Sequence, residues 1–247
     1  MCAKRLRIFA GPNGSGKSSI YRLIAERFPV GIYINADDLQ ADLSSSGRVD
    51  LLQFHPALSF EALHQFFDEH DLPKTYSIQF PFTRDSDGRI GLAETSGIGE
   101  KLAYAVAVLA DYIRRRLIDE GTDVSFETVL SHRSKLELMR QARVAGYRVY
   151  LYYVCVASPE ISKQRVALRV RQGGHSVPED KIVERYERSL SLLSQAVSLS
   201  DRAYLFDNTY SGASLKLEIN QGADVIPHEP LLPDWITRNL PKLVPSV

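Results

Sequence analysis

One stretch decides the fold of this chain: Gly11-Pro12-Asn13-Gly14-Ser15-Gly16-Lys17-Ser18, which fits the pattern G-x-x-x-x-G-K-[ST] at each fixed position. Apolar residues over 6–10 predict a strand before it, and 19–28 predict a helix after it. In such a loop the backbone N–H groups point at phosphate oxygens, the lysine reaches the β- and γ-phosphates, and the serine hydroxyl ligates Mg²⁺. We therefore predict that Gly11–Ser19 binds a nucleoside triphosphate with Mg²⁺ at Ser18. A Gly-rich turn without a ligand is the alternative.

The rest of the chain alternates between predicted strands and helices. Further strands are predicted over 31–35, 124–128, 147–156 and 203–206, with helices between them. Repeated strand–helix alternation with a P-loop first predicts an α/β fold, a parallel sheet with helices on both faces. We expect a single P-loop domain over 1–247. We place the alternating residues of 215–219 outside its core, with a turn at 220–222 and a pairing with 224–226.

Composition and charge are those of a water-soluble enzyme. Lys+Arg and Asp+Glu both number 30, so the formal net charge is zero and gives no general attraction to nucleic acid or to anionic membranes. Cys2 and Cys155 are too few for a disulfide framework, and Cys155 is expected to be a small buried residue. Neither a signal peptide nor a membrane span is recognisable, so we expect a cytoplasmic protein.

Acidic residues follow the second predicted strand at Asp37 and Asp38. Open α/β sheets bind ligands at this end of their strands, where a carboxylate can accept a proton from a hydroxyl or hold a metal-bound water. The alternative is that Asp37 or Asp38 is the N-cap of a helix over Leu39–Leu43. In an extended segment the two side chains would point to opposite sides, so only one would face the P-loop.

Residues 43–99 form the least regular part, an insertion predicted beside the acceptor site. Here Ser59 is expected to cap a short helix, and alternation over 76–82 predicts a strand. The turn Asp85-Ser86-Asp87-Gly88 would return as a strand over 89–92. Further on, Arg114-Arg115-Arg116 near the end of a long helix is interpreted as solvated surface, and Ser134 with Glu137 as a capping box.

Arginines gather in the segment 165–178. Arg165 and Arg169 share one face of a predicted helix, Arg171 follows, and Gly173-Gly174 is a flexible break. Phosphoryl transfer needs positive charge around the transferred group, and mobile lids of P-loop kinases supply it through arginines. Arginines on a solvated helix surface are the alternative.

An ordered series of segments resembles the zeta-toxin-like P-loop kinases. The resembling pieces are 9–19, 33–38, 126–134, 145–153, 158–160, 169–178 and 205–208. The resemblance implies an ATP-dependent kinase of a small molecule, in which Lys17 is catalytic. In the toxins of this family the substrate is a UDP-activated amino sugar such as UDP-N-acetylglucosamine, phosphorylated on a sugar hydroxyl.

The resemblance also implies roles for individual residues. Asp37 matches the catalytic base, and Glu127 and Thr128 match the motif that holds the sugar nucleotide, with Arg133 close behind. The arginine lid over the ATP phosphates takes in a further set of residues: Arg169 and Arg171, and as weaker members Arg165 and Arg185.

Two other readings stay open. The kinase could act on another nucleotide, a cofactor or a nucleic-acid end, although the neutral charge argues against nucleic acid. Alternatively, the chain could be a nucleotide-dependent switch in a toxin–antitoxin pair. An antitoxin protein is an expected partner of the family, but no antitoxin-like segment is evident in this sequence.

Overall fold

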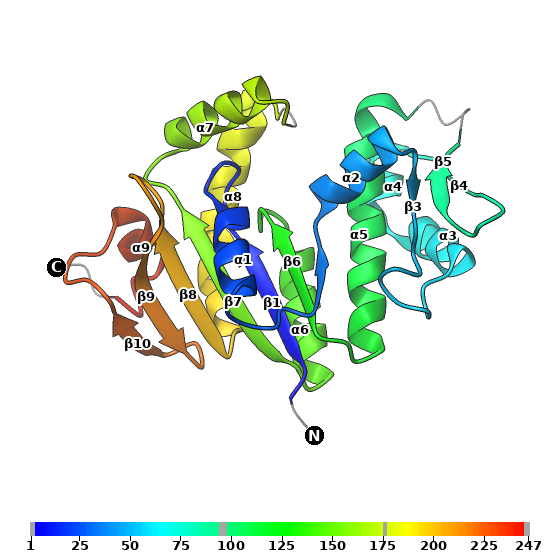
Figure 1. Ribbon diagram of the computed structural model, residues 1–247. Coiled ribbons are helices and arrows are strands. Elements are labelled where there is room, and N and C mark those ends of the chain that lie inside the picture. Colours follow the sequence, from blue (N-terminus) through cyan, green and yellow to red (C-terminus); the bar gives the residue numbers. More distant parts are fainter. Residues whose placement is uncertain (1–2, 94–97, 175–176, 245–247) are drawn as a thin grey trace. The chain divides into compact units, whose positions relative to one another are not determined.

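The computed structural model describes residues 3–93, 98–174 and 177–244 (Figure 1). The chain divides into two compact units. We call residues 1–31 and 125–247 the P-loop unit, and residues 32–124 the middle unit. The segment 43–99 lies wholly in the middle unit, which also takes in the residues on either side of it.

The P-loop unit is built on a mainly parallel sheet with the strand order β10-β9-β8-β7-β1-β6. These strands are β1 (Arg5–Ala10), β6 (Val124–Thr128), β7 (Arg148–Cys155), β8 (Arg202–Asp207), β9 (Ser214–Asn220) and β10 (Asp224–Pro227). Strand β7 pairs in parallel with both β1 and β8, whereas β9 and β10 add antiparallel strands. The predicted pairing of 215–219 with 224–226 is confirmed, since β10 pairs with β9. The placement of 215–219 outside the core is wrong, because β9 is hydrogen-bonded to β8 with Leu217 and Ile219 fully buried.

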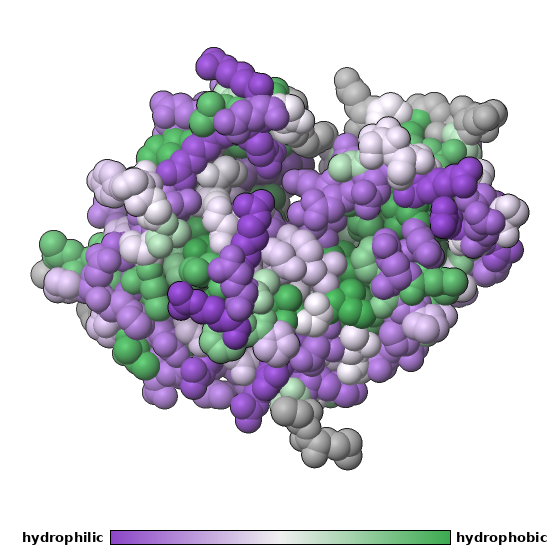
Figure 2. Space-filling view, in the orientation of Figure 1, coloured by the Kyte–Doolittle hydropathy of each residue, from purple (hydrophilic) through white to green (hydrophobic). Residues whose placement is uncertain are grey.

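Helices lie on both faces of this sheet, as the sequence predicts. They are α1 (Lys17–Ala25), α6 (Ser134–Val144), α7 (Pro159–Arg171), α8 (Glu179–Ser198) and α9 (Asp234–Asn239). Helix α1 covers one face, and α6 and α8 cover the other (Figure 1). The outward side of α1 is mainly hydrophilic (Figure 2), and Ile20, Tyr21 and Ile24 pack toward the sheet whereas Leu23 is exposed.

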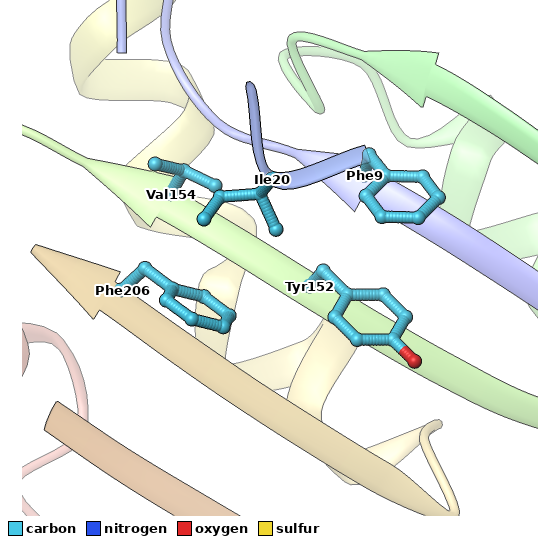
Figure 3. Close-up of a cluster of buried hydrophobic side chains, with 5 residues drawn as sticks. All are labelled: Phe9, Ile20, Tyr152, Val154 and Phe206. Atoms are coloured by element: carbon cyan, nitrogen blue, oxygen red, sulfur yellow. The ribbon is translucent and has the colours of Figure 1, made fainter. Parts of the chain in front are cut away.

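Aromatic packing joins α1 to the sheet (Figure 3). Ile20 of α1 meets Phe9, Tyr152, Val154 and Phe206 from three neighbouring strands. The rings of Phe9 and Tyr152 stack with centroids 4.8 Å apart, and such pairs contribute about 0.5–1.5 kcal/mol beyond the area they bury. This packing fixes α1, and with it the loop that precedes α1.

The middle unit is mostly helical. Its elements are β2 (Ile32–Ile34), α2 (Ala36–Ser45), β3 (Arg48–Val49), α3 (Phe60–Glu69), α4 (Asp71–Tyr76), β4 (Phe82–Arg84), β5 (Ile90–Leu92), η1 (Gly99–Lys101) and α5 (Leu102–Asp119). Helix α5 packs against α2, α3 and α4, and a small sheet has the order β3-β5-β4. The hydroxyl of Tyr112 in α5 donates to Ser59 O and accepts from Ser59 N, each at 3.0 Å. Ser59 also caps α3 as predicted, since its Oγ accepts from Ala62 N.

The strand predicted over 76–82 is wrong. Residues 71–76 form α4, His70 caps that helix through its Nδ1, and Ser77 ends it with a φ of 49°. Phe80 and Phe82 instead pack edge-on against Phe67 of α3, with centroids 5.3 and 6.2 Å away. The alternation of aromatics thus reflects a side-chain cluster, and the predicted hairpin survives only as β4 and β5.

The solvated surface expected at Arg114–Arg116 is also wrong for its first member. Arg114 is 3% exposed and Asp111 is 1% exposed. Asp111 accepts from Arg115 Nε at 3.0 Å and lies 3.8 Å from Arg114 Nη1. Burial lowers the pKa of Arg114 to about 10, and the charge of Asp111 opposes this shift. Arg114 is thus one of the buried residues of α5, a helix that packs against α2, α3 and α4.

Candidate active site

The segment Gly11–Ser18 runs from the end of β1 into the first turn of α1, and its glycines are needed where other elements approach closely. Gly11 has a φ of 137°, and a Cβ there would lie 1.9 Å from the carbonyl oxygen of Val154 in β7. Gly16 has a φ of 99° and occupies the N-cap position of α1. Both conformations strain any residue with a side chain. The sheet therefore holds the loop in one shape, with α1 starting directly behind it.

The two side chains predicted to contact phosphate and metal both have defined partners. Lys17 Nζ donates to Pro12 O at 3.0 Å, so the ammonium lies over the loop itself. Ser18 Oγ donates to Glu127 Oε2 at 3.0 Å. Glu127 belongs to β6 and is separated from Ser18 by 109 positions in the sequence. The structure thus brings together Ser18 and Glu127, which the sequence predicted for two different roles.

Helix α7 approaches the loop closely at Gly14. A Cβ on Gly14 would be 2.9 Å from Ser162 O and 3.2 Å from Arg165 Cβ. Arg165 Nη2 donates to the carbonyl oxygens of Thr209 and Tyr210, each at 3.4 Å. Arg165 therefore binds the segment after β8.

The remaining lid arginines lie on α7 and α8. Arg169 is half-buried and its carbonyl accepts from Gly174 N at 2.9 Å, whereas Arg171, the last residue of α7, is exposed. Arg185 is half-buried on α8. His175 and Ser176, which belong to the predicted lid, lie outside the described residues. The role of these arginines stays a prediction.

The residues after β6 form a tight turn into α6. Thr128 Oγ1 accepts from Leu130 N at 3.1 Å, and Leu130 has a φ of 57°. Arg133 is exposed and occupies the N-cap position of α6. The predicted capping box is wrong, because Ser134 is already helical and its Oγ lies 3.0 Å from His132 Nδ1 instead.

Asp37 and Asp38 lie in the first turn of α2, in the middle unit. The N-cap of α2 is Asn35, whose Oδ1 accepts from Asp37 N at 3.0 Å. The capping role considered for either aspartate is therefore wrong, and so is the expectation of an extended segment. In a helix, neighbouring side chains point about 100° apart rather than to opposite sides. Both carboxylates are exposed, and the base role of Asp37 stays a prediction.

Asn208 is a loop contact that the sequence analysis did not assign. Its Nδ2 donates to Ser15 O at 2.8 Å, across a separation of 193 residues. The available signal is its place in Asp207-Asn208, a polar pair at the carboxyl end of the buried strand β8. A polar residue at the carboxyl end of a strand in a P-loop sheet lies where such sheets bind ligands.

Cys155 is a buried thiol, as predicted. It lies at the end of β7 and is fully buried. Burial raises the pKa of its thiol to about 12, so the thiol stays neutral at physiological pH. A neutral thiol is a poor nucleophile and metal ligand, so Cys155 contributes packing rather than chemistry.

Comparison with known proteins confirms the predicted resemblance. Residues 93–207 match the family model described as Zeta toxin. An uncharacterized protein of Haemophilus influenzae is 37% identical over 60 residues, a match that covers 24% of this chain and 43% of that protein. The chain therefore spans less than half the length of this curated relative.

Two solved structures share the fold. A chain from the PezAT chromosomal toxin–antitoxin system of the human pathogen Streptococcus pneumoniae matches with a TM-score of 0.53 and 14% identity, over 98% of this chain and 79% of that one. A chain from the AvrRxo1-ORF1:ORF2 structure with ATP matches with a TM-score of 0.51 and 16% identity, over 92% and 61%. The predicted P-loop α/β fold is thus confirmed.

In the described part of the chain, every helix is too short or too polar to cross a membrane.

Proposed function

We propose that this chain is an ATP-dependent kinase that phosphorylates a hydroxyl of a small molecule, a nucleotide sugar such as UDP-N-acetylglucosamine. The observation that carries the proposal is the P-loop geometry: Lys17 lies over the loop, and Ser18 is hydrogen-bonded to Glu127. The Zeta toxin match over 93–207 supports the reaction type, and the AvrRxo1 structure with ATP supports ATP as the donor.

In this proposal the P-loop unit binds the donor. Backbone N–H groups of 11–19 cradle the phosphates at the N-terminus of α1, where the helix dipole favours negative charge. Lys17 exchanges the Pro12 carbonyl for phosphate oxygens and neutralises charge that develops during transfer. Arg169 and Arg171 add positive charge from α7, since stabilisation of that charge is the main contribution a protein makes to phosphoryl transfer.

Ser18 and Glu127 fit a Mg²⁺ ion. A hydroxyl and a carboxylate are the hard oxygen ligands that Mg²⁺ prefers, and here the two oxygen atoms are 3.0 Å apart. When bound, Mg²⁺ neutralises phosphate charge and orients the γ-phosphoryl group. The hydrogen bond to Ser18 favours a role for Glu127 in binding Mg²⁺. This role is proposed in addition to the sugar-nucleotide binding that the family resemblance implies.

The acceptor hydroxyl needs a base, and Asp37 is the residue we assign to it. The Asp37 carboxylate takes the hydroxyl proton while the hydroxyl oxygen forms a bond to the γ-phosphorus. The bond between the γ-phosphorus and the β–γ bridging oxygen breaks, and ADP leaves with that electron pair. Asp37 is exposed in the first turn of α2, so its carboxylate is accessible to a substrate. Thr128 and Arg133 are proposed to hold the sugar nucleotide.

We also propose a cytoplasmic location, where nucleotide sugars are available, and an antitoxin protein as partner. The support for a protein partner is that PezAT is a toxin–antitoxin system and that AvrRxo1-ORF1 was solved together with ORF2.

The test is incubation of the purified chain with ATP, Mg²⁺ and a panel of nucleotide sugars, nucleotides, cofactors and 5′-hydroxyl oligonucleotides, followed by mass spectrometry. We expect a nucleotide sugar to gain one phosphoryl group, and the gain to be absent with the Lys17→Ala variant. Phosphorylation of a different compound would replace the acceptor. ATP turnover with no phosphorylated product would favour a nucleotide-dependent switch, and no turnover would overturn the proposal.

A further inference from the structure

Asn208 stands at a rigid position between the last parallel strand and the P-loop. Its backbone N–H donates to Cys155 O at 2.8 Å, which continues the pairing of β8 with β7. Asp207, only 6% exposed, accepts from Trp235 Nε1 at 2.7 Å and from Thr209 N at 2.9 Å. Both residues beside Asn208 are thus anchored, and the carboxamide has little freedom to move.

The Asn208 carboxamide contacts one peptide group of the loop. Nδ2 donates to Ser15 O at 2.8 Å, and Ser15 is fully buried. A Cβ on Gly16 would lie 2.4 Å from the same Nδ2, so Asn208 can approach only because this residue is a glycine. The contact and the glycine with a φ of 99° therefore depend on each other.

Holding Ser15 O also orients the next N–H group. A peptide unit is planar, and in the trans form its C=O and N–H point in opposite directions. The described part of the chain has no cis peptide bond. Because Ser15 O points at Asn208, the Gly16 N–H points to the opposite side of the loop.

We propose that Asn208 is a positioning residue, which holds the Ser15–Gly16 peptide so that the Gly16 N–H faces the bound phosphates. The inference rests on the proposed binding of ATP. The contact comes from the residue after β8, which is not part of the P-loop sequence pattern. Asn208 acts through the backbone of the loop and touches no substrate in this assignment.

The test is nucleotide binding by the Asn208→Ala variant of the full chain. This change leaves the backbone bond to Cys155 in place and removes only the carboxamide. We expect the Kd for adenylyl imidodiphosphate with Mg²⁺ to rise about tenfold, because without the carboxamide the Ser15–Gly16 peptide can rotate in the free protein and must be ordered again when the phosphates bind. The Kd for inorganic triphosphate should rise by a similar factor. The melting temperature should also fall slightly, because the hydrogen bond is lost from the unliganded protein as well.

The neighbouring Thr209 offers a matched control. Thr209 Oγ1 accepts from Ala157 N at 3.0 Å and takes no part in the contact between Asn208 and the loop. Thr209→Val should lower the melting temperature but leave the Kd for the ATP analogue unchanged. A similar loss of affinity in both variants would show a general structural role and overturn the proposal.

Two further outcomes separate this inference from the proposed function. If the wild-type chain binds the analogue and Asn208→Ala binds it equally well, the positioning role is wrong while ATP binding stands. A loss confined to the analogue, without a loss for inorganic triphosphate, would mean contact with the base or ribose and would also overturn it. If the wild-type chain binds neither probe, ATP binding itself is wrong.

Discussion

The two compact units are stabilised in different ways. In the P-loop unit, parallel strands set the positions of the residues proposed to act on ATP. Glu127 of β6, Val154 of β7 and Asn208 directly after β8 all reach the same loop. In the middle unit, helix α5 and an aromatic cluster provide the core, and the strands are short. Hydrogen-bonded pairing along a long sheet fixes where the end of each strand lies, so residues at strand ends have defined positions. Packing in a side-chain cluster follows no such regular pattern.

This difference predicts where substitutions should affect chemistry. Substitutions of residues at strand ends in the P-loop unit should lower turnover with little effect on stability. Substitutions in the core of the middle unit should lower stability with little effect on nucleotide binding. The proposed base, Asp37, is the exception that can break the comparison, because it lies in the middle unit.

The largest effect is expected for Lys17→Ala. Lys17 supplies positive charge where the transferred phosphoryl group becomes more negative, and loss of such a group costs roughly 10²–10³-fold in kcat. Turnover of ATP by the purified variant, together with its circular dichroism spectrum, measures this. Near-wild-type turnover in a folded variant would show that the assignment of the active site to the P-loop is wrong.

Asp37→Asn should lower kcat by at least roughly 10²-fold, because a general base contributes about 10²–10⁴-fold. Asp38→Asn is the matched control, one residue further along the same helical turn. Since Asn35 is the cap of α2, neither change removes the cap, and both variants should melt close to the wild type. Paired turnover and melting measurements decide between them. The reversed order of activities would move the base to Asp38.

Glu127→Gln sharpens the comparison within the P-loop unit. If Glu127 acts on the metal side, the Mg²⁺ concentration for half-maximal turnover should rise about tenfold, in line with the 10- to 100-fold losses typical of groups that orient metal ligands. The KM for the acceptor should stay constant. A titration of turnover against Mg²⁺ and acceptor separates the two roles. A change confined to the acceptor KM would favour the sugar-nucleotide role.

The smallest effect on ATP binding is expected for Phe67→Ala, in the core of the middle unit. Phe67 is 1% exposed and contacts Phe80 and Phe82, so its truncation should cost about 3–5 kcal/mol of unfolding free energy. Leu52→Ala, at a site 59% exposed in the same unit, is the control and should cost little. Chemical denaturation and calorimetric titration with an ATP analogue measure the two quantities. Weaker analogue binding in folded Phe67→Ala would contradict the separation of roles.

Within the P-loop unit most elements could be predicted from the sequence, β9 being the exception because it was placed outside the core. The strands β1, β6, β7 and β8 and the helix α1 lie close to their predicted ranges, and α6, α7 and α8 lie between the strands as expected. The reason is that a strand buried on both faces needs a continuous apolar run, which is visible in sequence. In the middle unit the same reasoning failed at 76–82, because the packing partner of Phe80 and Phe82 is Phe67 of α3. It also failed at Arg114, because a run of basic residues does not show which of them lies on the buried side of α5. Periodicity shows that aromatic side chains are buried, but it does not show what buries them.

The sequence by itself determined that a P-loop exists, where it lies, and which α/β fold surrounds it. The reason is local: glycines at fixed spacing, a lysine and a serine are the chemistry that phosphate binding needs, and they lie within one short segment. Only the tertiary structure decided that Glu127 lies at Ser18, that Arg165 is bound by the 209–210 carbonyls, and that Asn208 holds Ser15. Those contacts join residues far apart in the chain, and only the pairing order of the strands brings them within hydrogen-bond distance.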